Sequence, residues 1–310
     1  MAPSDANVET SIALDPQDLG PEGEWRKANT EFWMTSKVDQ RTTYDRMFEK
    51  TPAAAGVRFE EIGDGRIQGW WARPEGAAAG QAILYLHGGS YTLGSAKAYR
   101  NFVSQIAARA NVAAFILEYP RAPEAPLPAA LELVDAARDW LGTQGVRALA
   151  LAGDSAGGGL ALAALAARGA SDGSVPVVAC VALSPWTDLT LRGVAATYPD
   201  PVLPIDGVLK GAEAYLGGQA AEDPRGSPVF GVPAGLPPLL IQVGTDERLL
   251  DDSKRYAAAA RERGNDVRLE IWEGMHHVFQ AQAGVLRSSG AALERVAGFL
   301  REGFGARGGL

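Results

Sequence analysis

The sequence predicts an α/β fold in which a mostly parallel, eight-stranded sheet carries helices on both faces. Apolar runs of strand length alternate with helical patterns from about residue 57 onward, which is typical of a parallel sheet covered by helices. The runs are short and partly β-branched, as expected of strands buried on both faces. The length of 310 residues fits one such core with attached segments.

The predicted strands begin with a hairpin. Residues 57–62 and 66–72 flank Gly63-Asp64-Gly65, a glycine-flanked turn that indicates antiparallel pairing. The parallel strands that follow are residues 82–86, 112–119, 148–152, 177–183, 239–243 and 267–272. The predicted helices are residues 98–109, 129–141, 158–168, 252–263 and 289–301.

Two segments do not follow this alternation. Residues 1–50 carry scattered aromatic residues among charges, which indicates amphipathic helices that precede the sheet. Residues 187–236 form a long connection rich in proline and glycine. A connection of that length is usually a functional lid or has structure of its own.

Charge and composition exclude several classes of protein. The 29 basic and 37 acidic residues give a net charge of −8, the wrong sign for collecting phosphates, so we expect no nucleic-acid partner. No apolar run approaches the roughly 20 residues that span a bilayer, so we expect no membrane insertion. The single cysteine, Cys180, cannot form an intrachain disulfide, and the N-terminus shows no signal-peptide pattern. Both observations predict a cytoplasmic protein.

The strongest chemical signal is Ser155. It stands in Gly153-Asp154-Ser155-Ala156-Gly157, between a predicted strand and a predicted helix, which is the context of a G-x-S-x-G nucleophile elbow. The flanking glycines permit the cramped backbone that exposes the hydroxyl, and the helix directs its positive N-terminal end at the site. The alternative is a glycine turn with a helix-capping serine, which the strand and helix on the correct sides disfavour.

A serine nucleophile needs a base, and the chain has three histidines. His87 opens HGGSY directly after a strand, where paired glycines can turn backbone N–H groups toward a developing oxyanion. The base is therefore His276 or His277, on the loop after the last strand. A serine that precedes its histidine in the chain fits the α/β-hydrolase order. The residues alone leave the choice between the two histidines open.

A carboxylate just past a strand should orient this histidine, and the segment after residue 243 offers Asp246, Glu247, Asp251 and Asp252. Asp246 follows the predicted strand most closely and is the predicted acid. Asp251 and Asp252 sit where helix-capping carboxylates belong, so we expect them to be structural. Asp188 is a weaker candidate because its strand comes earlier in the sheet order.

Six segments, in this order, resemble the bacterial hormone-sensitive-lipase-like esterases of the α/β-hydrolase fold: HGGSY, YPRAPEAPLPAA, GDSAGGGLA, LSPWTDL, VGTDERLLDD and EGMHHVF. The resemblance implies that Ser155 is the nucleophile, Asp246 the acid and His277 the base. It also implies an oxyanion hole at Gly88, Gly89, Ser90 and Ala156, in which Gly88 shapes the turn and the other three supply N–H groups.

Two segments depart from the family pattern. The usual HGGG is HGGS here, so the backbone N–H of Ser90 is usable only if a serine can adopt the required φ and ψ. The usual YRLAPE is YPRAPE here, which displaces the arginine by one position to Arg121.

The resemblance further implies a helical cap. Residues 1–50 and 187–236 would build it over a catalytic core of residues 51–186 and 237–310. Trp186 follows the Ser184-Pro185 turn at the end of a predicted strand, which makes it a candidate wall of the substrate pocket.

The implied activity is that of a serine carboxylesterase acting on short- to medium-chain acyl esters, and some related sequences open lactones. An amidase or peptidase with the same triad remains open, as does a non-catalytic ligand-binding protein of the same fold. The chemistry needs no metal and no organic cofactor, and no metal-ligand spacing is visible. The expected partner is a small-molecule ester, with a homo-oligomer left open.

Overall fold

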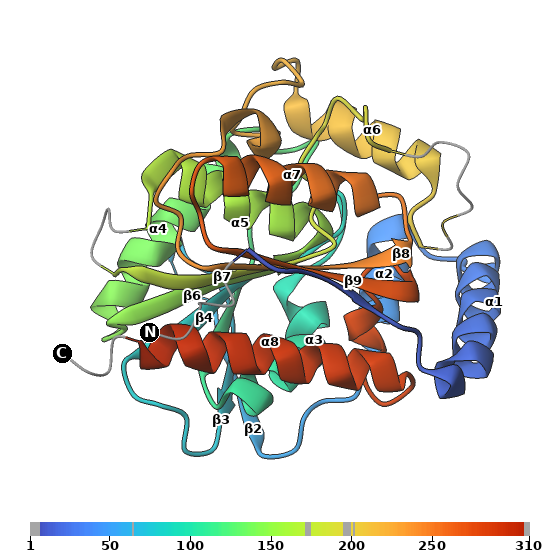
Figure 1. Ribbon diagram of the computed structural model, residues 1–310, viewed down its shortest axis with the longest axis horizontal. Helices are drawn as coiled ribbons and strands as arrows, with labels where there is room; N and C mark the ends of the chain where they lie inside the picture. Colours follow the sequence, from blue (N-terminus) through green and yellow to red (C-terminus); the bar gives the residue numbers. More distant parts are fainter. Residues whose placement is uncertain (1–6, 64, 171–174, 195–199, 201, 307–310) are drawn as a thin grey trace.

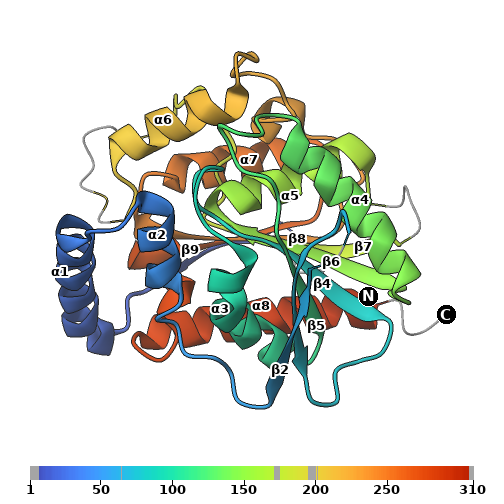
Figure 2. The same cartoon turned by 180° about the vertical axis from the view of Figure 1, so that it is seen from behind.

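A twisted sheet crosses the middle of the molecule, with helices packed on both of its faces (Figures 1 and 2). The computed structural model describes residues 7–306 except residues 64, 171–174, 195–199 and 201. Within these residues the sheet has nine strands, in the order β1-β9-β8-β7-β6-β4-β5-β3-β2. The strands are β1 (Glu9–Ile12), β2 (Val57–Ile62), β3 (Gly69–Pro74), β4 (Gln81–Leu86), β5 (Ala113–Leu117), β6 (Ala148–Asp154), β7 (Val177–Leu183), β8 (Leu239–Asp246) and β9 (Val267–His276).

The predicted α/β fold is confirmed, and all eight predicted strands are present. The ninth strand, β1, is missing from the prediction because its four residues are partly exposed and carry no apolar run. It pairs in parallel with the edge strand β9, so residues 9–12 belong to the sheet and not to the predicted cap segment. β2 and β3 pair antiparallel as predicted, although Asp64 of the predicted turn lies outside the described residues.

Five helices cover the two faces of the sheet (Figure 1). They are α3 (Ala96–Ala110) and α8 (Arg287–Gly305) on one face, and α4 (Ala129–Thr143), α5 (Ser155–Arg168) and α7 (Leu250–Glu262) on the other. All five are predicted, with starts that differ by at most a few residues. The largest difference is in α5, which begins at Ser155 because the helix starts directly at the end of β6.

Apolar packing on both faces holds this core together. The strands β5 and β7 are buried along their whole length, and Cys180 of β7 is a buried free thiol. One cluster of buried apolar side chains joins the sheet to α4, α5 and α7, and a second joins it to α3 and α8. Because β6, β7, β8 and β9 are parallel neighbours, their carboxyl ends meet at one edge of the sheet.

Three further helices lie over or beside this edge: α1 (Leu19–Thr35), α2 (Gln40–Phe48) and α6 (Ile205–Leu216). The structure also contains the short 3₁₀ turns η1 (Pro16–Asp18), η2 (Pro228–Gly231) and η3 (Phe279–Gln282). Among the helices described, none combines the length and the apolar character needed to cross a membrane.

Candidate active site

Ser155 occupies a strained turn between β6 and α5. Its φ is 52°, in the left-handed region that non-glycine residues rarely adopt. The chain passes so close to its neighbours here that a Cβ on Gly157 would overlap the carbonyl oxygen of Leu86, and a Cβ on Gly153 would overlap Gly157. The flanking glycines are therefore needed for close backbone approach, as the sequence predicts for a nucleophile elbow.

His277 lies beside this serine. It follows the end of β9, is buried, and places Nε2 2.9 Å from the Ser155 Oγ. Its Nδ1 lies 3.0 Å from Oε1 of Glu247. Of the two histidines that the residues alone leave open, the geometry brings His277 to the serine.

Asp246, the predicted acid, does not contact His277. Its Oδ2 lies 3.1 Å from the Arg26 guanidinium, and its Oδ1 accepts a hydrogen bond from Thr245 Oγ1 at 3.0 Å. The reason is that β8 continues past its apolar run to Asp246. The strand ends there and the chain bends at Glu247, so Asp246 and its neighbour Glu247 face different partners.

Glu247 takes the place predicted for Asp246. Its side chain is fully buried, and its Oε2 accepts hydrogen bonds from Ser184 Oγ at 2.7 Å and from the Gly244 N–H at 2.9 Å. These two bonds leave Oε1 directed at His277. Glu247 is one of the four carboxylates that the sequence offers after residue 243, but the apolar pattern does not show that β8 continues to Asp246, and so it does not single out Glu247.

The environment of His277 favours its protonated form. Burial acts to lower the pKa of this histidine, but the charge and the hydrogen bond of the Glu247 carboxylate outweigh burial. The carboxylates of Asp200 and Asp154 act in the same direction, and the pKa of His277 is raised above its ordinary value. The side chain is thus prepared to hold a proton taken from a neighbour.

The HGGS segment supplies backbone N–H groups beside Ser155. Gly89 and Ser90 have φ values of 116° and 52°, and both line the same pocket as Ser155. Ser90 thus adopts the left-handed conformation without being glycine. Among the contacts of the described residues, none occupies the N–H of Gly89, Ser90 or Ala156. The N–H of Gly88 donates to Asp154 Oδ1 at 3.0 Å, so Gly88 shapes the turn and its N–H faces away from the pocket.

Asp154 connects this loop to the elbow, a role that sequence reasoning misses although the residue precedes Ser155. Its carboxylate is buried and also accepts hydrogen bonds from the hydroxyls of Tyr85 at 2.9 Å and Tyr99 at 3.0 Å. Burial raises the pKa of Asp154 to about 6, against the lowering effect of the two tyrosines. The aspartate therefore fixes the oxyanion loop relative to the nucleophile.

His87 has no contact with Ser155. It is fully buried, stacks on Tyr119 with a 4.2 Å centroid distance, and places Nδ1 2.8 Å from the Gly88 carbonyl oxygen. Burial lowers the pKa of His87 to about 3, so it stays neutral near neutral pH. This agrees with the prediction that His87 belongs to the glycine loop and is not the base.

The pocket above Ser155 is mostly apolar. Its lining residues outside the catalytic cluster are Trp25 of α1, Tyr44, Met47 and Phe48 of α2, Val202 and Leu203 of the 187–236 segment, and Val278, Ala281 and Gln282 after β9. The segments predicted to form a cap therefore both reach the pocket.

Trp186 is not part of this wall, contrary to the prediction from its position. Only 1% of its surface is exposed, and it packs in the core against Tyr91. The chain turns inward directly after β7, so that the Trp186 N–H donates to the Ser155 carbonyl oxygen at 2.9 Å. Trp186 thus packs in the core and its backbone N–H holds the carbonyl of Ser155.

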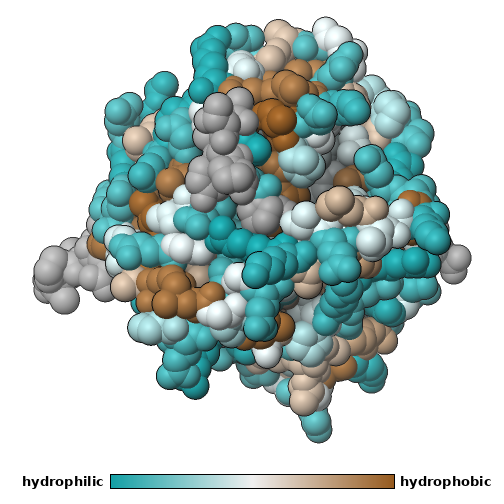
Figure 3. Space-filling view, turned by 90° about the vertical axis from the view of Figure 1, so that its right-hand side faces the viewer, coloured by the Kyte–Doolittle hydropathy of each residue, from teal (hydrophilic) through white to brown (hydrophobic). Residues whose placement is uncertain are grey.

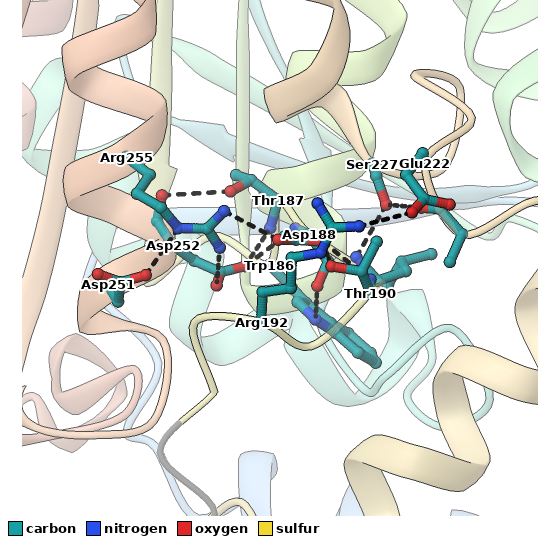
Figure 4. A network of polar contacts seen from close by, with 12 residues as sticks. Trp186, Thr187, Asp188, Thr190, Arg192, Glu222, Ser227, Asp251, Asp252 and Arg255 are labelled. Atoms are coloured by element: carbon teal, nitrogen blue, oxygen red, sulfur yellow. Dashed lines mark hydrogen bonds and ion pairs between the residues drawn. The ribbon is translucent and has the colours of Figure 1, made fainter.

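The 187–236 segment is anchored at its start by a polar network (Figure 4). Asp252 Oδ2 accepts hydrogen bonds from the N–H groups of Thr187 and Asp188, both at 2.9 Å. Arg255 then bridges Asp188 at 2.8 Å and Asp251 at 2.6 Å. These contacts give Asp251 and Asp252 the structural role expected of them and place Asp188 away from His277. In the described part of the chain, no three His, Cys, Asp or Glu side chains gather as metal ligands.

Comparisons with known proteins find the same fold and relatives named as esterases. The sequence profile of a family described as alpha/beta hydrolase fold matches residues 83–281. An acetyl-hydrolase of Streptomyces hygroscopicus is 39% identical over 272 residues, which cover 86% of this chain and 90% of the relative. An esterase of Acinetobacter venetianus is 34% identical, with 76% of this chain and 78% of the relative covered.

Solved structures show the same similarity. The crystal structure of an esterase from the bacterial hormone-sensitive lipase family superposes with a TM-score of 0.85 at 36% identity, covering 91% of this chain and 98% of that one. A hormone-sensitive lipase from a metagenome library superposes with a TM-score of 0.82 at 32% identity, covering 94% and 99%.

Proposed function

The chain belongs to the bacterial hormone-sensitive-lipase-like esterases of the α/β-hydrolase family and is a carboxylic ester hydrolase, and we propose that Ser155, His277 and Glu247 are its catalytic triad. The observation that carries this assignment is the pair of contacts made by the His277 ring. One nitrogen lies 2.9 Å from Ser155 Oγ, and the other lies 3.0 Å from Glu247 Oε1.

The reaction begins with attack of the Ser155 oxygen on the ester carbonyl carbon. Neutral His277 accepts the hydroxyl proton at Nε2 as the new C–O bond forms. Glu247 holds the Nδ1 proton of the ring, which fixes the tautomer that leaves Nε2 free as acceptor. Its negative charge also stabilises the imidazolium, in keeping with the raised pKa of His277.

The carbonyl oxygen becomes negatively charged in this step. We assign its binding to the N–H groups of Gly89, Ser90 and Ala156, which have no acceptor among the described contacts and lie around Ser155. Donors that are already oriented stabilise such an oxyanion without reorganisation, which is usually a large part of esterase catalysis. The N–H of Ala156 is also at the first turn of α5, where the helix dipole favours negative charge.

The tetrahedral intermediate then collapses. Protonated His277 returns its proton to the leaving alkoxide, the alcohol departs, and the acyl group remains on Ser155. A water molecule then gives a proton to His277 and attacks the acyl carbon, forming a second tetrahedral intermediate. As this intermediate collapses, the bond between the acyl carbon and the Ser155 oxygen breaks, His277 returns its proton to that oxygen, and the carboxylic acid leaves. The non-catalytic alternative is disfavoured because the base His277 lies within hydrogen-bonding distance of both the nucleophile Ser155 and the acid Glu247.

We propose short- to medium-chain acyl esters as substrates, with lactones as related candidates. Support comes from the pocket, whose apolar side chains suit a hydrocarbon acyl group and whose walls come from both cap segments. The proposed cap consists of α1 and α2 together with residues 187–236, over a core of residues 51–186 and 237–310. The strand β1 belongs to the core sheet.

The proposal is tested with the purified full chain on p-nitrophenyl acetate, butyrate, octanoate and palmitate, with p-nitroacetanilide and a γ-lactone in the same panel. We expect saturation kinetics on the short esters, a decline toward palmitate, and labelling of Ser155 by a serine-directed organophosphate. Rates that rise steadily from butyrate to palmitate would refute the proposal that the cap limits the length of the acyl chain. A higher rate on the anilide than on the acetate ester would favour the amidase alternative.

Location and assembly remain predictions from the sequence. A cytoplasmic location is supported by Cys180 being a lone, buried cysteine, whose pKa burial raises to about 12. Cell fractionation tests the location. Gel filtration with light scattering tests whether the chain forms a homo-oligomer.

A further inference from the structure

The strands β8 and β9 each end in a pair of ionisable residues that face opposite ways. Glu247 and His277 point toward Ser155, as described above. Their neighbours Asp246 and His276 are direct partners in the register of the two strands. Asp246 and His276 both contact α1 of the cap. Each catalytic residue, Glu247 or His277, therefore directly follows a residue that binds the cap helix.

A continuous chain of polar contacts between ionisable side chains joins α1 to the two strands. The Glu22 carboxylate lies 2.7 and 2.9 Å from His276 Nδ1 and accepts a hydrogen bond from Arg26 Nε at 2.8 Å. Arg26 Nη2 then donates to Asp246 Oδ2 at 3.1 Å and to the Gly274 carbonyl oxygen at 2.9 Å. We call Glu22 and Arg26 together the α1 clamp. Glu22 and His276 are both buried, so the contact is shielded from water.

No apolar side chain of α1 is fully buried. The residues that this helix buries are Glu22 and Asn29, both polar, whereas Leu19 and Met34 are 63% and 81% exposed. The face of the molecule that carries α1 is largely hydrophilic, with only separate hydrophobic patches (Figure 3). The helix therefore depends on the clamp, and on its half-buried aromatic side chains, to stay on the sheet.

Trp25 connects the clamp to the substrate pocket. Its ring stacks on His276 with a centroid distance of 3.8 Å and an interplanar angle of 13°. The same side chain lines the pocket together with Ser155 and His277. Because Trp25 lies between the two clamp residues on α1, movement of the helix would move this wall of the pocket.

We propose that Glu22 and Arg26 are positioning residues that lock α1 against β8 and β9, so that Trp25 limits the length of the ester that the pocket accepts. The inference rests on the proposed function for its substrate class. It makes Trp25 the specificity-determining residue. It also gives Asp246 and His276 a role distinct from that of their catalytic neighbours.

The test compares variants of the full chain on p-nitrophenyl acetate and p-nitrophenyl octanoate. Glu22→Ala, Arg26→Ala and Trp25→Ala should each raise the octanoate-to-acetate ratio of kcat/KM by about tenfold. In Glu22→Ala and Arg26→Ala, which change no residue that lines the pocket, kcat on acetate should stay within about threefold of wild type. Arg26→Lys, which keeps the charge and can still reach one acceptor, should restore part of the wild-type ratio. Glu24→Ala and Lys27→Ala are matched controls, since both side chains are exposed on the same helix, and should leave the ratio unchanged.

Two results would overturn the proposal. One is a ratio that stays within about twofold of wild type in all three variants. The other is an equal loss of kcat on both esters, because a clamp that acted only through the triad would slow every substrate alike. If Glu22→Ala does not fold, the Arg26→Ala and Arg26→Lys pair gives the same comparison.

Hydrogen exchange separates this inference from the proposed function. In the clamp variants, amides of residues 19–35 should exchange faster while those of α3 and α5 stay protected. A wild type without esterase activity would refute the proposed function, yet this measurement would still test the clamp. If the wild type is an active esterase but the amides of α1 exchange at the same rate in the wild type and in the clamp variants, the role of the clamp is refuted and the proposed function is not.

Discussion

The nucleophile elbow and the helix α1 border the same pocket, but different forces hold them. The first three turns of α5 from Ser155 onward are entirely buried, and a Cβ atom at Gly153 or Gly157, on either side of the serine, would overlap backbone atoms. In α1 the buried residues are polar, and the helix is joined to β8 by the Arg26–Asp246 ion pair and to β9 by the contact of Glu22 with His276. Close packing holds the reacting serine, whereas a few charged contacts hold the wall that surrounds the substrate. Rate and selectivity should therefore be separable by mutation.

The largest expected effect is on the elbow. Ser155→Ala should lower kcat by roughly 10⁵ or more, because no other nucleophile lies beside His277 in the described site. The melting temperature of the Ser155→Ala variant should stay near that of wild type, since the change leaves no sizeable cavity. Steady-state kinetics and calorimetry on one preparation measure both. Activity within about tenfold of wild type would show that the nucleophile is a different residue.

The two adjacent histidines give the next comparison. His277→Ala should lower kcat by roughly 10⁴ or more. His276→Ala should lower kcat by about tenfold, because it removes a buried ring from the packing next to His277 as well as the contact with α1. Measuring both variants on one ester decides which ring accepts the proton. The reverse ranking would move the base to His276.

The two adjacent carboxylates make a parallel test. Glu247→Gln keeps the size of the side chain but removes the charge that orients His277, so kcat should fall by roughly 10³. Asp246→Asn should cost less than about tenfold, because Asp246 contacts Arg26 and not the histidine. Equal losses in the two variants would mean that the two carboxylates do not have separate roles.

The pH profile should carry the signature of the Glu247 contact. His277 must be neutral to accept the serine proton, so kcat/KM is lost as pH falls through its pKa. Because the pKa of His277 is raised, the loss of kcat/KM on the acidic side of the pH profile, its acid limb, should be centred above the ordinary histidine value of about 6.5. In Glu247→Gln, burial is no longer outweighed by the carboxylate, and the limb should move to lower pH. A limb that does not move would assign it to another group.

The smallest effects concern stability. Leu160→Ala in the buried part of α5 should lower the free energy of unfolding by about 2–5 kcal/mol through lost burial and a cavity. Met34→Ala on α1 removes a side chain that is 81% exposed and should change the free energy of unfolding by less than about 0.5 kcal/mol. Urea denaturation of both variants measures the difference. Comparable losses would mean that α1 is held by apolar packing after all.

The same contrast explains what the sequence could predict. Local sequence patterns predict the core: apolar runs indicate its strands and helices, and the glycine motifs GDSAG and HGGS indicate the turn at Ser155 and the oxyanion loop. The contact of Glu22 with His276 joins residues 254 positions apart, and no local pattern indicates it. The choice of Glu247 over Asp246 depends on how far β8 continues beyond its apolar run, and the inward turn of Trp186 depends on the packing under the elbow.

The connections on either side of α1 add a consequence for its motion. Before the helix, β1 pairs with β9, and the Asp18 carboxylate accepts hydrogen bonds from the N–H groups of Arg287 and Ser288 at the start of α8. After the helix, α2 packs on α3 through Phe48. The helix is thus tethered at both ends, so its local concentration at the pocket stays high even when the α1 clamp is open. Opening and closing of this wall should accordingly be a unimolecular process whose rate does not depend on protein concentration.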